Sequence, residues 1–485
     1  MLISNSRGCT LRIVVGITTL ITLLACTAAA GAASATWDVG NESNILEQKG
    51  LNHAPVAAEY VPGEILVKFK PYVGEGAVNA LISEQGSSVE STLLSGTKII
   101  QIPAGKTVDE MVSIHESLAE VEYAEPNFIV HALMVPDDPY YSYQWHLHGF
   151  DQGGINMEPA WEISTGSSAV VAVIDTGVAY EDYDIYCQAS DLAGTTFVQG
   201  YDYVNSDSHP NDDHRHGTHV AGTIAQTTNN LEGVAGVAFD CSIMPVKVLN
   251  ATGYGTTAMI ANAIYYATDN GADIISMSLG APASSTMEDA VMYAYNHGVT
   301  VIAAAGNEYL KGNAPCYPAA YDDYVIAVGA TRYDKTRSYY SNTGSYLDLV
   351  APGGDTTVDQ NSDGYDDGVL QQTFSGDPCT FDYWFLQGTS MATPHVSGVA
   401  ALLIADGVTG PDNIRNALES TAHDLGDPGW DEEYGWGLVD AEAALEGASA
   451  CGDVNCDGAV NMGDVILLLN HVSDPSEYVL GCCGD

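Results

Sequence analysis

Basic residues are scarce in this sequence. Only 14 lysine and arginine residues stand against 63 aspartate and glutamate residues, which gives a formal net charge of −49 at pH 7. A surface of this sign repels nucleic acid and anionic membranes, so we exclude both classes of partner. Hydrophobic residues still make up 46% of the 485 residues, and 28 are tyrosines. These numbers argue for a packed protein of two to four domains rather than an acidic disordered chain.

Long apolar runs are missing after the first 35 residues. Two arginines precede an apolar run at 13–25, and small residues follow at 33–35. This order predicts a secretory signal peptide over 1–35, so we expect a secreted, extracellular or cell-surface protein. The segment ending at Cys26 also resembles a lipoprotein box, which leaves lipidation open. The later apolar runs near 299–305 and 396–404 are too short to span a membrane.

The sequence also lacks a CxxC pair, which argues against a structural zinc site. An exported chain permits disulfides, but the spacing of the cysteines does not define their connectivity. Beyond the signal region the cysteines form a dispersed group and a C-terminal group: Cys187, Cys241, Cys316 and Cys379, and Cys451, Cys456, Cys482 and Cys483.

A small α+β unit is predicted within residues 36–134, after a polar linker. Residues 64–70, "EILVKFK", alternate like a strand, and a second strand is expected at 97–103. Helices are expected at 76–85 and 108–119, followed by an extended segment at 121–133. The unit carries no cluster of residues that indicates catalysis.

Residues 135–447 are predicted to form a large α/β domain. The segments "AVVAVID", "ADIISMSLG" and "VTVIAAAGN" are apolar without alternation, as expected of parallel strands that are covered on both faces. Helical segments are expected at 259–270 and 286–297, between and around these strands. The alternation predicts a doubly wound, mostly parallel sheet.

Three polar residues stand out in this domain. Asp175 ends an apolar strand, His216 opens the helical run "HGTHVAGTIA", and Ser390 opens a buried helix with a proline, Pro394, expected in its first turn. Taken singly, they suit a turn aspartate, a packed histidine and a helix N-cap. Together they compose an orienting carboxylate, a general base and a nucleophile.

The same domain resembles the subtilisin-like serine proteases (subtilases). The resemblance rests on "AVIDTGV" around Asp175, "HGTHVAGTIA", "SMSLG", "AAAGN" and "GTSMATPHVSG" around Ser390, in that order. It implies that Ser390 is the nucleophile, His216 the base, Asp175 its orienting partner and Asn307 a donor to the oxyanion. It further implies two backbone segments that bind the substrate as an added strand: Gly253, Tyr254 and Gly255, and Ser278, Leu279 and Gly280.

The N-terminal unit resembles the inhibitory propeptide of the same family, which implies self-cleavage between about residues 132 and 136. The segment "PCYPAAY" beside Asn307 contains no charged partner for a substrate side chain. We therefore expect a broad, mostly apolar preference at the residue before the cleaved bond.

Calcium is the expected cofactor, because oxygen side chains recur at the spacing of calcium loops. Two candidate sites lie in the α/β domain, formed by Asp202, Asp207 and Asn211, and by Asp359, Asn361 and Asp363. The tail, 448–485, resembles one dockerin-type repeat with candidate ligands Asp453, Asn455, Asp457, Asn461 and Asp464. A cohesin-like partner is one expectation; a truncated repeat or a calcium-bound, disulfide-closed stub are the alternatives.

The sequence thus predicts a secreted, self-processed, calcium-stabilised serine endopeptidase that acts as a monomer on proteins or peptides. The alternative is a catalytically silent, calcium-dependent extracellular binding protein. An acid-active relative that uses serine with glutamate and aspartate is excluded by the presence of His216 and Asn307.

Overall fold

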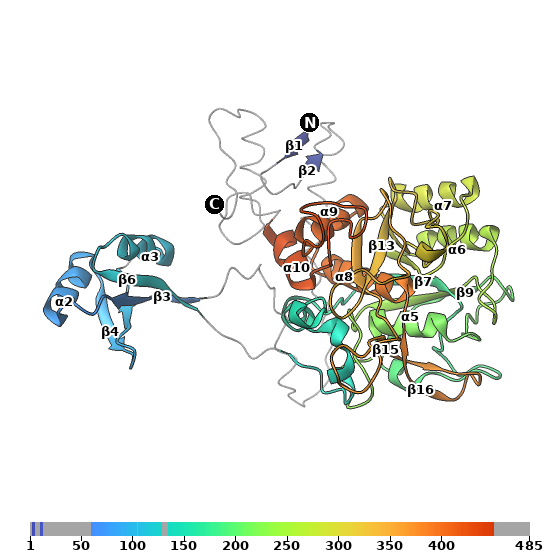
Figure 1. The fold of residues 1–485 in the computed structure, drawn as a ribbon, viewed down its shortest axis with the longest axis horizontal. Coiled ribbons are helices and arrows are strands. Elements are labelled where there is room, and N and C mark those ends of the chain that lie inside the picture. Colours follow the sequence, from blue (N-terminus) through green and yellow to red (C-terminus); the bar gives the residue numbers. More distant parts are fainter. Residues whose placement is uncertain (1, 5–9, 13–59, 104, 129–133, 451–485) are drawn as a thin grey trace, which may run out of the picture. The chain divides into compact units, whose positions relative to one another are not determined.

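The computed structural model describes residues 2–4, 10–12, 60–103, 105–128 and 134–450 (Figure 1). Within it the chain divides into two compact units, one of them spanning His53–Ala132. Near the N-terminus, β1 (Leu2–Ser4) pairs antiparallel with β2 (Thr10–Arg12). The apolar run of the predicted signal, Cys26 and the dockerin-like tail with its five candidate ligands lie outside the described residues.

The smaller unit is a four-stranded antiparallel sheet with two helices. Its elements are β3 (Tyr60–Phe69), α2 (Glu75–Glu84), β4 (Ser88–Thr92), β5 (Lys98–Gln101), α3 (Val108–Glu116) and β6 (Val121–Phe128). The strand order is β4-β5-β3-β6. Strand β4 was not predicted from the sequence, because all its residues are exposed and "SVEST" shows no apolar alternation. Thr107 and Glu110 form a capping box that begins α3.

The larger unit is built on a parallel sheet, ordered β14-β13-β12-β11-β7-β10-β8 with β9 paired to β10. Its strands are β7 (Val170–Asp175), β8 (Thr196–Phe197), β9 (Tyr201–Asp202), β10 (Ser242–Lys247), β11 (Ile274–Met277), β12 (Thr300–Ala304), β13 (Val325–Thr331) and β14 (Leu349–Pro352). The central strands are buried almost without exception, so helices cover both faces. The predicted parallel α/β class is confirmed.

The helices of this unit are α4 (Met157–Ile163), α5 (His216–Ala225), α6 (Thr257–Asp269), α7 (Ser285–Asn296), α8 (Thr389–Ala405), α9 (Pro411–Thr421) and α10 (Ala441–Ala450). Short 3-10 turns occupy Tyr141–Tyr143, Trp145–Leu147, Phe150–Gln152, Ser190–Leu192 and Tyr309–Lys311. Helix α5 packs on α8, and α6 packs on α7 (Figure 1).

A hairpin of β15 (Val369–Phe374) and β16 (Phe381–Leu386) follows the sheet and packs its first strand against α5. A disulfide joins Cys187 to Cys379, which lies in the turn of this hairpin. Among the residues that the structure describes, Cys241 and Cys316 have no disulfide partner. The structure therefore settles, for these four cysteines, a connectivity that the sequence left open.

Helix α8 corrects one expectation. Because the helix begins at Thr389, Pro394 lies in its second turn and not in its first. A proline there has no N–H to donate to the carbonyl four residues earlier, which belongs to Ser390. The hydroxyl of Ser278 donates to this carbonyl oxygen instead, at 2.7 Å. The side chain that follows β11 thus replaces the missing helical hydrogen bond.

Candidate active site

Asp175 and His216 form a hydrogen-bonded pair at the carboxyl edge of the sheet. His216 Nδ1 lies 2.8 Å from Asp175 Oδ1, and Asp175 is fully buried at the last position of β7. Burial by itself lowers the pKa of His216, but the charge of Asp175 and its hydrogen bond outweigh this effect and raise the pKa above its usual value. The pair therefore holds the imidazole with Nε2 turned away from the carboxylate, in the role of a base.

The position of His216 depends on tight backbone packing. Arg215, just before α5, has φ of 89°, a left-handed conformation that is strained for arginine. At Gly217 a Cβ atom would lie 2.1 Å from the carbonyl oxygen of Gly177, so only glycine fits there. The "HG" of the motif therefore reflects the close approach of α5 to the turn after β7.

Ser390 lies in the first turn of α8, at the positive end of the helix dipole. Its hydroxyl donates to the carbonyl oxygen of Ser278 at 3.3 Å, so the serine–histidine hydrogen bond is not engaged here. Ser278 exchanges two hydrogen bonds with Ser390 and lines the same groove as His216. Catalytic hydrogen bonds of this type often tighten only when substrate is bound.

Asn307 follows β12 and is oriented by the residue before the serine. The N–H and hydroxyl of Thr389 both contact Asn307 Oδ1, at 2.9 and 3.1 Å. Because a backbone N–H requires an acceptor, the side-chain oxygen must face Thr389, and the NH₂ group is left to face outward. That group lies near Gly388, beside the N–H of Ser390. Two potential donors thus lie close together beside Gly388, next to the serine.

A groove of about 620 Å³ lies beside His216. It is lined by both predicted substrate-binding segments, Gly253–Gly255 and Ser278–Gly280, and by Thr176, His214 and Leu249. At Gly255 a Cβ atom would meet the carbonyl oxygen of Val248 at 2.2 Å, and at Gly280 it would meet Cys316 Sγ at 2.1 Å. Glycine at these positions lets each wall segment pack closely against the chain beside it.

Three buried histidines lie behind the site. His146 Nδ1 is 2.7 Å from His395 Nε2, and His395 Nδ1 contacts the carbonyl oxygen of Met391. His219 Nε2 lies 3.1 Å from the carbonyl oxygens of Val369 and Trp384. Burial lowers the pKa of His219 to about 3 and that of His395 to about 4. These side chains are neutral packing groups.

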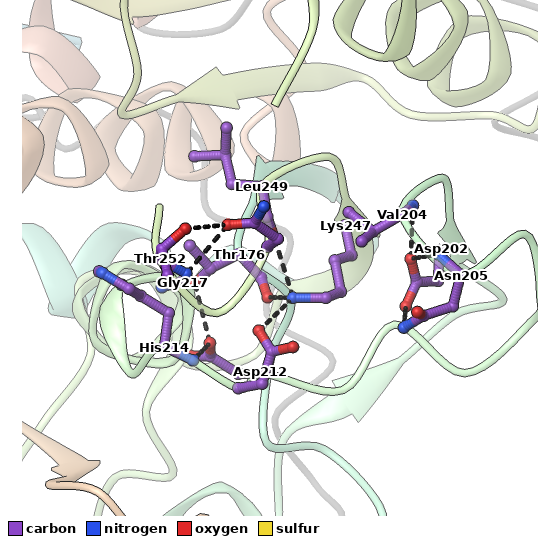
Figure 2. Close-up of polar contacts among 12 residues, drawn as sticks. Thr176, Asp202, Val204, Asn205, Asp212, His214, Gly217, Lys247, Leu249 and Thr252 are labelled. Atoms are coloured by element: carbon purple, nitrogen blue, oxygen red, sulfur yellow. Dashed lines mark hydrogen bonds and ion pairs between the residues drawn. The ribbon is translucent and has the colours of Figure 1, made fainter. Parts of the chain in front are cut away.

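The predicted calcium ligands behave differently in the two loops. No set of three or more His, Cys, Asp or Glu side chains in the described part of the chain is arranged to hold a metal ion. Asp202 accepts from the N–H groups of Val204 and Asn205 (Figure 2), and Asp207 accepts from that of His209. The side-chain oxygen of Asn211 is buried without a hydrogen-bond partner. Asp202 and Asp207 thus close turns of the loop, whereas the Asn211 amide donates to Glu181 Oε1 at 3.2 Å.

The second loop is closer to a cation site. Asp359, Asn361 and Asp363 each accept a backbone N–H of the same loop. Asp367, which was not among the ligands predicted from the sequence, is 1% exposed and has one buried oxygen without a hydrogen-bond partner. Burial raises the pKa of Asp367, and the charges of Asp359 and Asp363 raise it further. This fourth side chain adds an oxygen that suits a divalent cation.

Three further functional candidates were missed. Asp138 and Asp191 are buried carboxylates at the loop 227–234: Asn229 N–H donates to Asp138, and the Asn230 side chain donates to Asp191. Lys247 is a fully buried cation at the end of β10. For Asp191 and Lys247 the only sequence signal is a single charged residue among apolar or small neighbours, as in "IMPVKVL", and Asp138 is one of two adjacent aspartates in "PDDPYY".

A parallel α/β fold with a histidine–aspartate pair at a strand end and a serine in the first turn of a buried helix is the arrangement of a serine hydrolase. Comparison with known proteins narrows this class. The Subtilase family matches residues 166–437, and the Fervidolysin N-terminal prodomain matches residues 47–127. The chain belongs to the subtilase family of serine proteases and carries an N-terminal prodomain.

The relatives are proteases. The chain is 38% identical over 402 residues to a thermophilic serine proteinase of Bacillus sp. (strain AK1), covering 81% of this chain and 88% of that protein. It is 42% identical over 313 residues to thermitase of Thermoactinomyces vulgaris, covering 64% and 99%. A solved structure of proteases from Pseudoalteromonas arctica PAMC 21717 is 37% identical with a TM-score of 0.57, covering 65% of this chain and all of that chain.

Within the described ranges no helix is long and apolar enough to cross a membrane.

Proposed function

We propose that the protein is a secreted serine endopeptidase that uses Asp175, His216 and Ser390 as its triad and is made as a self-cleaving precursor. The observation that carries this proposal is the 2.8 Å contact between a buried strand-end aspartate and His216. Export is supported by relatives that are named extracellular proteases, from Natrialba magadii and Xanthomonas campestris.

The chemistry follows from the donors and acceptors at the groove. Ser390 Oγ attacks the peptide carbonyl while His216 Nε2 takes its proton, and Asp175 stabilises the resulting imidazolium. The negative charge on the carbonyl oxygen is met by the Asn307 NH₂ group and the Ser390 N–H. His216 then gives the proton to the leaving amine. The acyl group stays on Ser390 until a water molecule, activated by His216, releases it.

Substrate orientation follows from the two groove walls. A peptide laid between Gly253–Gly255 and Ser278–Gly280 can pair with both backbones as an added strand. Main-chain pairing of this kind does not select side chains. We therefore propose a broad sequence preference, with apolar residues favoured before the cleaved bond.

The test compares the precursor with Ser390→Ala and with Ser420→Ala, a matched control on the surface helix α9. We expect the parent and Ser420→Ala to lose the N-terminal prodomain, cleave casein and react covalently with a sulfonyl fluoride. Ser390→Ala should stay full length and unlabelled. Processing and hydrolysis by Ser390→Ala at the parental rate would refute the assignment; inertness of all three proteins in calcium would favour the silent binding protein.

We propose calcium as a stabilising ion, since subtilases generally bind calcium. Two places in the described residues suit it. Asp138 has a buried oxygen without a hydrogen-bond partner and lies near Asp191, whose pKa burial raises to about 7. The loop Asp359–Asp367 supplies carboxylate and amide oxygens and the buried Asp367. A calcium ion would offset the charge of these buried carboxylates without taking part in catalysis.

The calcium proposal is tested by thermal unfolding of unprocessed Ser390→Ala protein in a calcium series. Calcium at 100 times its dissociation constant adds about 2.7 kcal/mol to the free energy of unfolding. Asp191→Asn and Asp367→Asn should each remove part of this gain, whereas Asp427→Asn, at an exposed position, should keep it. A calcium response that neither buried variant reduces would place the ions elsewhere. The tail ligands and a cohesin-like partner remain predictions from the sequence.

A further inference from the structure

Lys247 is a fully buried cation beside the candidate active site (Figure 2). It ends β10, where its Cα is in register with Asp175 of β7 and with Asp202 of β9. Its ammonium donates to the carbonyl oxygen of Thr176, to Asp213 Oδ1 at 2.6 Å and to the carbonyl oxygen of Leu249 at 2.9 Å. An ammonium has three N–H donors, and all three are used. A buried charge is tolerated only with such full pairing.

The three partners belong to three different parts of the site. Thr176 follows Asp175, Asp213 belongs to the loop that leads into His216, and Leu249 begins the segment that reaches Gly255 in the groove. No two of these parts are adjacent in sequence. Lys247 is therefore the point at which the carboxylate, the base and one substrate wall are held together.

Hydrogen bonds of Thr176 connect the Lys247 contact to the catalytic pair. Its N–H donates to Asp175 Oδ1 at 2.6 Å, and its hydroxyl accepts from the Gly217 N–H at 2.9 Å, at the start of α5. The same hydroxyl donates to Asp212, which in turn accepts from the His214 N–H. A shift of the Thr176 carbonyl would thus move both the acceptor of the His216 hydrogen bond and the first turn of its helix.

The wall segment is held in a similar way. Leu249, whose carbonyl contacts Lys247, directly precedes Asn250. The side-chain oxygen of Asn250 accepts from the N–H groups of Thr252 and Tyr254. Asn250 N–H donates to the Tyr254 carbonyl, which closes this turn. Lys247 fixes the base of the turn that presents Gly253–Gly255 to the groove.

We propose that Lys247 is a positioning residue for peptide hydrolysis, which aligns Asp175, His216 and the Gly253–Gly255 wall through its three hydrogen bonds and holds a positive charge near the base. This inference rests on the proposed function. The side chain does not touch substrate. Its positive charge partly offsets the carboxylates around it, Asp213, Asp212 and Asp202.

The sign of the charge effect follows from the groups that face the two side chains. Asp175 on β7, and Asp212 and Arg215 on the preceding loop, act on His216, which also interacts with His219 of its own helix. His214 has its ring centroid 6.3 Å away. Lys247 faces Asp213, and its charge also reaches Asp212 and Asp202. Removing the lysine charge leaves this region more negative, so protonated His216 is favoured.

The experiment measures kcat and KM for a peptide that spans the groove, from pH 5 to 9, with active-site titration. Lys247→Met should lower kcat/KM by about 10- to 100-fold, mostly in kcat. It should also move the acid limb of the pH profile upward by about half a pH unit. Lys247→Arg keeps the charge and should leave the acid limb in place. Lys335→Met is the matched control, because Lys335 donates to the Phe150 carbonyl, away from these segments.

A second variant keeps the test decisive if Lys247→Met does not fold. Asp213→Asn, whose carboxylate is 23% exposed, removes the partner charge and should move the acid limb downward. Opposite shifts in Lys247→Met and Asp213→Asn, or the Asp213→Asn shift alone, support the inference. Two results, if they coincide, would make Lys247 a structural residue only. The acid limb of the pH profile would be unmoved in every variant that folds, and the loss of kcat/KM would vanish once rates are corrected by active-site titration. Hydrolysis that survives in Ser390→Ala would instead refute the proposed function.

Discussion

The hydrogen bond from Ser278 to the Ser390 carbonyl allows a sharp prediction about how the nucleophile is held. Pro394 cannot donate to this carbonyl, and the Ser278 hydroxyl does so at 2.7 Å. Ser278→Ala therefore leaves a partly buried acceptor without a partner. We expect this to lower the free energy of unfolding by about 1–2 kcal/mol.

The proline makes a double-mutant cycle possible. Pro394→Ala restores an N–H four residues after Ser390, and a helix can then satisfy the same carbonyl without Ser278. The proline substitution has its own cost, from the buried ring and the freer unfolded chain. In the Pro394→Ala background, however, Ser278→Ala should cost less than about 0.5 kcal/mol, because its partner is no longer left unpaired.

The assay is urea unfolding at constant calcium, in a Ser390→Ala background that prevents autolysis. Tryptophan fluorescence reports on the catalytic unit, since Trp145 and Trp161 are buried there and the sequence of the prodomain unit, 53–132, has no tryptophan. The four proteins give the coupling energy directly. An equal cost of Ser278→Ala with and without Pro394 would refute the reasoning.

Three other outcomes follow from the site. Asn307→Leu should lower kcat by about 100- to 1,000-fold with little change in KM, which is the size known for removal of an oxyanion donor in subtilisin itself. Thr389→Val removes only one contact to Asn307, so its kcat should fall far less. Because the pKa of His216 is raised, kcat/KM should fall as pH drops through a value above 6.5 and level off above it; a profile flat down to pH 5 would contradict this. The buried histidines have lowered pKa values, so protonation of the unfolded chain should cost stability as pH falls from about 6.5 toward 4. Replacement of the His146–His395 pair by Gln and Met should flatten that slope in urea titrations.

Much of the fold was predictable because the central strands have an unusual pattern. Uninterrupted apolar segments such as "AVVAVID" are required when a parallel strand is covered on both faces. The predicted helices 259–270 and 286–297 agree with α6 and α7 to within two residues. By contrast, β4 lies exposed at the edge of its sheet, so burial imposed no pattern on it.

The site divides in a similar way. Asp175, His216, Asn307 and Ser390 follow strands or open helices, and the motifs around them are distinctive enough to define the family from the sequence. Their glycines, such as Gly217, are required by backbone contacts that any chain with this geometry must make. The predicted calcium ligands were less informative, because acidic turns with internal hydrogen bonds have the same composition as calcium loops.

The sequence by itself determined the parallel α/β class, the order of the chemical groups and the protease family, since apolar periodicity and short motifs are local. Tertiary structure alone decided which buried charges have partners and which do not. The oxygens of Asp138 and Asp367 stay unpaired because of what packs around them. The Ser278 bond that replaces the one Pro394 cannot make, and the contacts of Lys247 with Thr176 and Asp213, join residues that are distant in the chain. Whether a buried polar group has a hydrogen-bond partner depends on what packs against it. That neighbour is often distant in the chain, so the local sequence pattern does not identify it.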